Sequence, residues 1–263
     1  MSPLPAVATF MFHEVTDDPT SSGFQRPGAI AYKHGTSAFT EHLTAIAAGP
    51  VSPTLVTGID LAVPGRHVLL TFDDGGVSAL TAAAMLEERG WKGHFFIVTD
   101  RIGTRGFLSA DQLQRLRRAG HTIGSHSHSH PSIFRELPVA RMVEEWRGSS
   151  DLLAQLLGEP CLSASVPGGD ISRRVLESAG AAGLRYLFTS EPWLAPRRVD
   201  GCWALGRFSV KVSTPPENVR ALAQFQGWTN ALIRRRMKVL ATRALPPLYR
   251  LYIRARTRER TPS

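Results

Sequence analysis

Residues 67–76 read HVLLTFDDGG, an apolar run that ends in two adjacent carboxylates and two glycines. A short apolar run bounded by glycines is typical of a buried strand in a parallel sheet. Asp73 and Asp74 then lie at the carboxyl end of that strand, where α/β folds gather their chemistry. Such a carboxylate pair needs a partner, because unpaired buried charge is costly. A polar β–α turn with a helix-capping Asp is the structural alternative.

Apolar runs and helical patterns alternate along the chain around this stretch. Further strands are expected at residues 6–12, 94–98, 121–125, 161–166 and 185–190. Helices are expected at residues 37–49, 77–90, 109–120, 138–157 and 171–183. Ser109 and Gln112 have the spacing of a capping box at the start of one of these helices. Strands that alternate with helices predict a mostly parallel sheet, with enough β/α units to close into a barrel.

Residues 17–37 are rich in Gly, Pro, Ser and Thr. This composition predicts a long surface loop. Because loops often border binding and catalytic sites, this one is a candidate cover for an active site.

A histidine cluster, HSHSHP at residues 126–131, follows the strand expected at 121–125. The carboxyl ends of parallel strands share one edge of a sheet, so the cluster and the Asp pair are expected to meet there. One carboxylate and two imidazoles form a usual ligand set for catalytic zinc. His126 and His130 share a side if the segment is turned, and all three histidines point together if it is extended. A solvated histidine-rich loop is the alternative.

The segments TFDDG and GSHSHSHP resemble the first two motifs of NodB-type polysaccharide deacetylases, carbohydrate esterase family four. FMFHEV, residues 10–15, is similar to the opening motif of many members. The resemblance covers roughly residues 66–215. It implies an α/β fold, a distorted (β/α)7 barrel, which we expect over residues 1–227, with a basic helical tail at 228–263.

The resemblance also implies a metal-dependent hydrolase that acts on a carbon–nitrogen bond. Asp73 becomes the general base. Asp74, His126 and His130 become ligands of a divalent metal, with Zn²⁺ expected and Co²⁺ or Ni²⁺ as alternatives. His128 becomes a neighbour that binds no metal. The implied substrate is an acetylated carbohydrate or polysaccharide precursor, with an N-acetyl group favoured over an O-acetyl group.

Two later motifs depart from the family pattern. The third motif usually reads R-x-P-[YF]-G, and its arginine orients the catalytic Asp. Here the segment reads SASVPGGD, so Pro167 and Gly168 match as substrate-site residues while Ser165 replaces the arginine. This segment, with the following SRRVLE and FTSEP, resembles a subgroup found with exopolysaccharide synthesis.

The late Leu-x-His motif, which supplies a general acid in the family, reads Leu205-x-Arg207 here. No histidine follows His130 in the sequence. We expect Arg207 to stabilise charge at the substrate, and His13 is the candidate acid if the first strand ends near the metal. A buried histidine bonded to the backbone is the alternative for His13. The missing groups also leave open a catalytically impaired carbohydrate-binding protein on the same fold.

The net charge of +9 lies entirely in residues 228–263, which hold ten Lys or Arg and one acid. Ile233, Met237, Leu240 and Ala244 follow a helical spacing, which predicts an amphipathic helix. A basic amphipathic helix suits an anionic membrane surface. A helix packed on the barrel with a solvated basic face is the alternative. No recognised nucleic-acid motif accompanies the charge, so nucleic acid is not favoured.

The sequence also bears on the cellular compartment. Cys161 and Cys202 form no disulfide framework, which favours a reduced compartment. The first residues lack a basic segment and a cleavage site, so no signal peptide is expected. No apolar run is long enough for a transmembrane helix. We therefore expect the protein in the cytoplasm or at the inner face of the membrane.

Overall fold

The computed structural model describes residues 5–169 and 171–244. Nine strands of this part form one sheet, in the order β11-β1-β4-β5-β6-β7-β8-β10-β9. Their bounds are β1 Ala6–Phe12, β4 Arg66–Phe72, β5 His94–Ile97, β6 Thr122–Ser125, β7 Ser163–Ser165, β8 Tyr186–Phe188, β9 Arg197–Val199, β10 Cys202–Leu205 and β11 Phe208–Ser209. Every neighbouring pair is parallel except β9 with β10.

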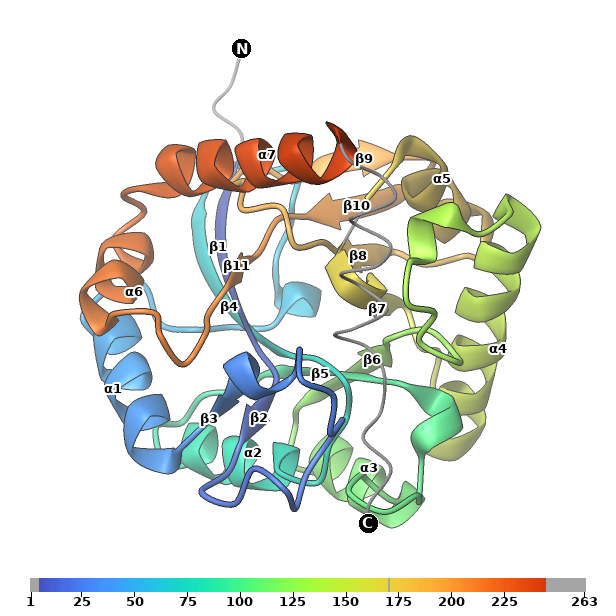
Figure 1. Cartoon of the computed structure of the whole chain (residues 1–263), viewed down its shortest axis with the longest axis horizontal. Helices are drawn as coiled ribbons and strands as arrows, with labels where there is room; N and C mark the ends of the chain where they lie inside the picture. The colour runs from blue at the N-terminus through green and yellow to red at the C-terminus, as the bar shows by residue number, and fades with distance from the viewer. Residues whose placement is uncertain (1–4, 170, 245–263) are drawn as a thin grey trace.

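The sheet is curled in the middle of the molecule, and the helices are arranged around it (Figure 1). The α-helices are α1 Thr36–Ala47, α2 Ala79–Glu87, α3 Ala110–Arg118, α4 Val139–Leu157, α5 Arg173–Ala181, α6 Pro216–Ala223 and α7 Trp228–Ala244. Short 3₁₀ helices lie at Ile30–Tyr32, Val56–Gly58, Thr99–Arg101, Phe134–Glu136 and Pro167–Gly169. The expected α/β fold with a curled, mostly parallel sheet is confirmed. Among the described strands no pairing joins β11 to β9, so the barrel stays open at that seam.

Strand β4 shows how the sheet divides inside from outside. Val68, Leu70 and Phe72 belong to the core between the sheet and its surrounding helices. Leu69 belongs to a second cluster that fills the interior of the curled sheet. Because successive strand residues point to opposite faces, Asp73 continues the inward-facing row.

The segment at residues 17–37 contains short regular elements at its end, the 3₁₀ helix Ile30–Tyr32 and the strand Lys33–His34. Glu14–Val15, strand β2, pairs with Lys33–His34, strand β3. The aromatic ring of Phe24 lies 5.2 Å from that of His130, and the ring of Tyr32 lies 4.5 Å from that of His13. The segment therefore borders the carboxyl edge of the sheet, as expected of a loop that covers a site.

The structure moves several predicted boundaries. Helix α1 begins at Thr36 with Gly35 as its N-cap and ends at Ala47, against the bounds of 37–49 expected from the sequence. The capping box of Ser109 and Gln112 is confirmed. Strands β9 to β11 and helix α6 lie in a region for which the sequence patterns predicted no elements.

The predicted tail helix is present as α7, up to Ala244. The rest of the tail, residues 245–263 with Pro246 and Pro247, lies outside the described residues. Within the described part of the chain, no helix combines the length and the apolarity needed to cross a bilayer.

Candidate metal and active site

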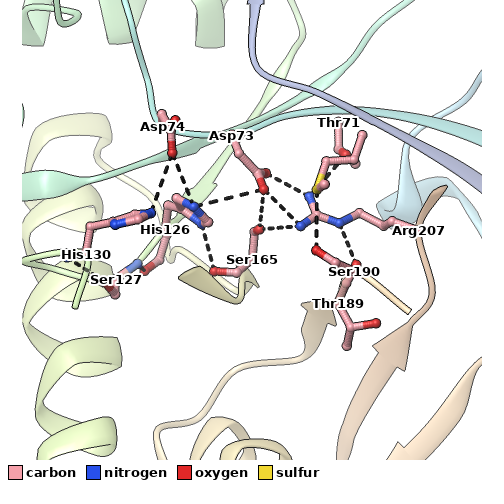
Figure 2. Close-up of polar contacts among 12 residues, drawn as sticks. Thr71, Asp73, Asp74, His126, Ser127, His130, Ser165, Thr189, Ser190 and Arg207 are labelled. Atoms are coloured by element: carbon pink, nitrogen blue, oxygen red, sulfur yellow. Dashed lines mark hydrogen bonds and ion pairs between the residues drawn. The ribbon is translucent and has the colours of Figure 1, made fainter. Parts of the chain in front are cut away.

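The carboxyl ends of three parallel strands bring these residues together (Figure 2). Asp73 and Asp74 follow β4, His126 follows β6, and Ser165 ends β7. Both Asp73 and Asp74 are buried, and so is His126. The two sequence motifs, about fifty residues apart, therefore meet at one edge of the sheet, as their places in the predicted strand pattern required.

Asp74, His126 and His130 offer ligand atoms that all lie within 4.8 Å of one another. Asp74 Oδ1 lies 3.4 Å from His126 Nε2 and 3.7 Å from His130 Nε2. The two imidazole rings are 5.0 Å apart between centroids. One carboxylate oxygen and two imidazole nitrogens thus face a common point, which is the geometry expected around a single cation.

The backbone is strained at this cluster. Asp74 has a φ of 78°, Ser127 of 64° and His130 of 52°, all in the left-handed region that side-chain-bearing residues seldom adopt. At Asp74 this conformation turns the chain away from the strand direction. As a result, the carboxylates of Asp73 and Asp74 both approach His126. Strain of about 1–3 kcal/mol per residue persists only where the surroundings enforce it, and it clusters at functional sites.

Hydrogen bonds fix the orientation of His126. Its Nδ1 lies 2.9 Å from the carbonyl oxygen of Ser165, which can only accept a hydrogen. Nδ1 therefore carries the proton, and Nε2 presents its lone pair toward Asp74 when the ring is neutral. This backbone anchor on the second nitrogen is typical of metal-binding histidines.

The charges of the cluster fit a divalent cation. Burial opposes ionisation of Asp74, but the histidines outweigh it and hold the pKa of Asp74 well below its ordinary value. Burial, helped by the neighbouring His126, lowers the pKa of His130 to about 3. Burial also disfavours the charged form of His126, yet the Asp73 and Asp74 charges raise its pKa overall. The ionised carboxylate of Asp74 and the neutral ring of His130 are therefore in the states that bind a metal. At His126 a cation would take the place of the proton that the two carboxylates favour.

Asp73 is held by Arg207 through two parallel hydrogen bonds. Arg207 Nη1 donates to Asp73 Oδ1 at 2.7 Å, and Nη2 donates to Oδ2 at 2.9 Å. Nη2 also donates to Ser165 Oγ at 2.7 Å, and this hydroxyl donates on to Asp73 Oδ2 at 3.0 Å. Burial opposes ionisation of Asp73, but the Arg207 charge together with His126 holds the pKa of Asp73 below its ordinary value.

The expectation that Arg207 contacts substrate is wrong for this structure, because its side chain has no exposed surface. Arg207 lies between β10 and β11, where the chain crosses the open seam of the sheet. Its Nε donates to the carbonyl oxygen of Thr189 at 2.8 Å, and Nη1 also donates to Thr71 Oγ1 at 3.2 Å. Arg207 therefore acts on Asp73 from inside the curled sheet and ties strand ends together.

His13 lies directly after β1, at the same edge of the sheet. Burial lowers its pKa, while the Asp74 and Asp73 charges oppose that shift. These charges identify His13 as a neighbour of the carboxylates. Its Nδ1 is buried and has no hydrogen-bond partner within the described part of the chain, so the alternative of a histidine bonded to backbone through that atom does not hold.

The remaining predicted residues lie at the rim or apart from the cluster. Pro167 is buried and Gly168 is exposed, both directly beyond β7. His128 is exposed, and its Nδ1 lies 2.9 Å from Thr99 Oγ1. His128 therefore does not belong to the cluster of Asp74, His126 and His130 in this structure.

Comparisons with known proteins identify polysaccharide deacetylases as similar proteins. A family model described as polysaccharide deacetylase matches residues 60–187. The Bacillus subtilis protein YxkH, named as a polysaccharide deacetylase, is 27% identical over 162 residues, which are 61% of this chain and 57% of that protein. A peptidoglycan-N-acetylmuramic acid deacetylase of B. subtilis is 32% identical over 98 residues, which are 36% of this chain and 20% of that protein. The chain thus covers less than two thirds of either relative.

Solved structures share the fold. A polysaccharide deacetylase from Bacillus cereus matches with a TM-score of 0.70 at 16% identity, over 84% of this chain and 69% of that one. IcaB from Ammonifex degensii matches with a TM-score of 0.67 at 20% identity, over 84% of this chain and 97% of that one. The family match includes both the Asp pair and the histidine cluster, and the fold likeness extends well beyond it. Residues 60–187 thus match the polysaccharide deacetylase family, and the wider chain shares the fold of solved polysaccharide deacetylases.

Proposed function

We propose that the protein is a metal-dependent deacetylase that removes an N-acetyl group from a carbohydrate or polysaccharide precursor. The observation that carries the proposal is the convergence of Asp74, His126 and His130 on one point, with Asp73 beside them. A divalent cation at that point, Zn²⁺ by its donor set, would lower the pKa of a bound water and polarise the acetamide carbonyl.

Asp73 is the proposed general base. The Arg207 pair keeps its carboxylate ionised and fixes its direction, while Oδ2 lies 4.0 Å from His126 Nε2 and so faces the ligand cluster. A base held at this place can take the proton of the attacking water. The positions of Pro167 and Gly168 directly beyond β7 support a role for them in bordering the acetyl group of the substrate.

His13 is the proposed proton donor to the leaving amine. An amine is a poor leaving group unless it is protonated, and His13 is the histidine at this edge that belongs neither to the ligand cluster nor to its rim. Its place after β1 beside Asp73 and Asp74 supports this role, because their charges favour a protonated ring against the burial that lowers the pKa of His13. Ordinary general acid catalysis contributes about 10²–10⁴-fold.

The test is acetate release from a panel of N-acetylated and O-acetylated sugars by metal-loaded and metal-stripped protein. We expect release from an N-acetylated member, loss of release after stripping, and loss in Asp73→Asn. His13→Gln should lose activity on the amide but keep it on p-nitrophenyl acetate, whose leaving group needs no proton. Absence of acetate release from every member with Zn²⁺, Co²⁺ and Ni²⁺ would remove the proposal.

The second candidate is a carbohydrate-binding protein without turnover. It is favoured by one observation, the absence of a histidine at the family's late motif, where this chain has Arg207. Sugar binding measured by calorimetry without acetate release, in protein that holds its metal, would support this candidate.

A further inference from the structure

Helix α7 has one face fixed on the body of the protein. Trp228 at its start is buried, and its Nε1 donates to the carbonyl oxygen of Leu222 at 2.9 Å. Arg235 Nε donates to Glu191 Oε1 at 2.9 Å, and Arg235 Nη2 donates to the carbonyl oxygen of Gly169 at 3.3 Å. These contacts define the rotation of the helix about its axis. The helix lies along the outside of the sheet (Figure 1).

The opposite face of α7 carries an apolar stripe in contact with solvent. Ile233 is 50% exposed, Met237 67% and Leu240 66%. Their spacing of four and three residues places them on one side of the helix. The other large apolar side chains that are exposed in the described residues lie singly on separate segments: Ile30, Val63, Val139, Leu162 and Val212.

Basic residues border this stripe on both sides. Arg234 and Arg236 are exposed, and at 100° per residue they lie to the left and right of Ile233 around the helix axis. Residues 228–244 contain no acid. The sequence adds five arginines and one glutamate at 245–263. An apolar stripe flanked by positive charges is the pattern of helices that bind the surface of an anionic bilayer.

We propose that the outward face of α7 is a peripheral anchor on an anionic lipid surface, with Ile233, Met237 and Leu240 entering the headgroup boundary. Arg234 and Arg236 would reach up to lipid phosphates from the sides of the stripe. A second copy of the chain is a poorer occupant, because it would bring the same cations face to face. This inference does not depend on the deacetylase proposal.

Flotation of the full chain with vesicles tests the anchor. Vesicles of equal parts phosphatidylglycerol and phosphatidylcholine should carry the protein, and vesicles of phosphatidylcholine alone should not. Each exposed cation near an anionic surface contributes about 1 kcal/mol, so Arg234→Gln with Arg236→Gln should weaken binding about thirtyfold. The triple variant Ile233→Gln, Met237→Gln, Leu240→Gln should abolish flotation.

A matched triple variant elsewhere controls for general loss of apolar surface. Ile30→Gln, Val63→Gln and Val212→Gln change three exposed apolar residues on other segments and should float like the wild type. Unchanged thermal midpoints show that both triple variants fold. Wild-type flotation of the α7 triple variant would overturn the proposal. The proposal would also be overturned if neither protein floats and if the wild type is a dimer that the α7 triple variant converts to a monomer.

Discussion

At position 207 the chain has an arginine where the family's late motif has a histidine, and at position 165 it has a serine where the third motif has an arginine. The structure relates the two changes. Arg207 donates to both oxygens of Asp73, and Ser165 fits between the guanidinium and the carboxylate. The Asp73 carboxylate therefore has an arginine partner, but the guanidinium reaches it from another strand end.

Arg207→Lys tests this contact while keeping the charge. A lysine has a single ammonium and cannot replace the two parallel hydrogen bonds to Asp73. Misplacement of a catalytic group by about 1 Å costs about 10²-fold in rate, and we expect kcat to fall by that order with KM little changed. The pKa of Asp73 should rise when these bonds are lost, so the acid limb of the pH–rate profile should move to higher pH.

The matched control is Arg173→Lys, which alters an exposed i,i+4 pair with Glu177. It should leave both the rate and the profile unchanged. An acid limb of Arg207→Lys that coincides with the wild type would show that Arg207 does not govern Asp73.

Exchange of the two positions gives a second residue-scale prediction. Arg207→His alone removes the buried partner of Asp73, and breaking a buried ion pair costs about 3–5 kcal/mol. Adding Ser165→Arg places a guanidinium where the family has one. We expect the double variant to recover at least part of both the thermal midpoint and the acetate release that the single variant loses. If the single and double variants lose the same thermal midpoint and the same acetate release, an arginine at position 165 does not replace Arg207.

At the scale of elements, the turn between β4 and α2 explains why two glycines follow the Asp pair. Gly75 has a φ of 79°, which favours glycine. A Cβ on Gly76 would collide with both carboxylate oxygens of Glu14. Glu14 is buried after β1, and its Oε2 accepts hydrogen bonds from Ser22 Oγ and Ser78 Oγ. This carboxylate thus joins the loop at residues 17–37, which borders the site, to the turn that carries Asp74.

Gly76→Ala should destabilise the fold because the turn must move away from Glu14. Overpacking in a buried place typically costs about 1–3 kcal/mol. Gly148→Ala is the control, since its Cβ would meet nothing within 4 Å in the middle of α4. Helix propensity should make that variant more stable by about 0.5–1 kcal/mol. Urea denaturation at one pH compares the three proteins, and equal midpoints for Gly76→Ala and wild type would contradict the packing account.

Glu14 should also make stability depend on pH. Burial raises its pKa from 4.5 to about 7. Between these values the native protein keeps a proton that the unfolded chain has released, so the free energy of unfolding falls as the pH rises through this window. The slope is at most about 1.4 kcal/mol per pH unit. Glu14→Gln should flatten the dependence, whereas Glu41→Gln, on the exposed side of α1, should not. Parallel stability curves for Glu14→Gln and wild type between pH 4.5 and 7 would refute this.

The elements that the sequence predicted are those whose signal is local. Strands β1, β4 and β5 are apolar runs, and α3 begins at a recognisable capping box. Strands β10 and β11 are short and are defined by pairing with distant partners, β8 and β1. Their patterns are too short to distinguish from loops, so the seam of the sheet could not be located from the sequence.

The same limit explains which part of the site was predicted. Asp74, His126 and His130 lie in compact motifs at strand ends, and the parallel sheet alone brings them to one edge. Arg207 pairs with Asp73 across 134 residues, through a chain crossing that depends on the seam. The segment around Arg207, CWALGRFSV at residues 202–210, carries no local sign of the partner of this arginine. From the sequence we therefore expected the guanidinium of Arg207 at the substrate. In the structure this guanidinium is buried and pairs with the Asp73 carboxylate.

At the scale of the whole molecule, the candidate metal would link strand ends that the sheet holds apart. Asp74 extends from β4, and both histidines extend from β6, with β5 between these strands. Arg207 makes the corresponding link on the other side of Asp73, from the seam to Thr189 after β8. The complete ligand set forms only in the folded chain, since Asp74 is about fifty residues away from the two histidines in the sequence.

Binding of a metal should therefore stabilise the fold in a way that can be measured without any substrate. Free metal at 100 times its dissociation constant adds about 2.7 kcal/mol, which corresponds to roughly 5–10 °C in the thermal midpoint of a chain of this size. We expect Zn²⁺ to raise the midpoint of metal-stripped wild type by that amount. His130→Gln should lose the rise, while His128→Gln should keep it, because His128 belongs to the same histidine run but lies outside the ligand cluster. An equal rise in both variants would show that the metal binds elsewhere. If Zn²⁺, Co²⁺ and Ni²⁺ all fail to raise the midpoint of the wild type, the buried charge and strained backbone of Asp74 do not form a metal site.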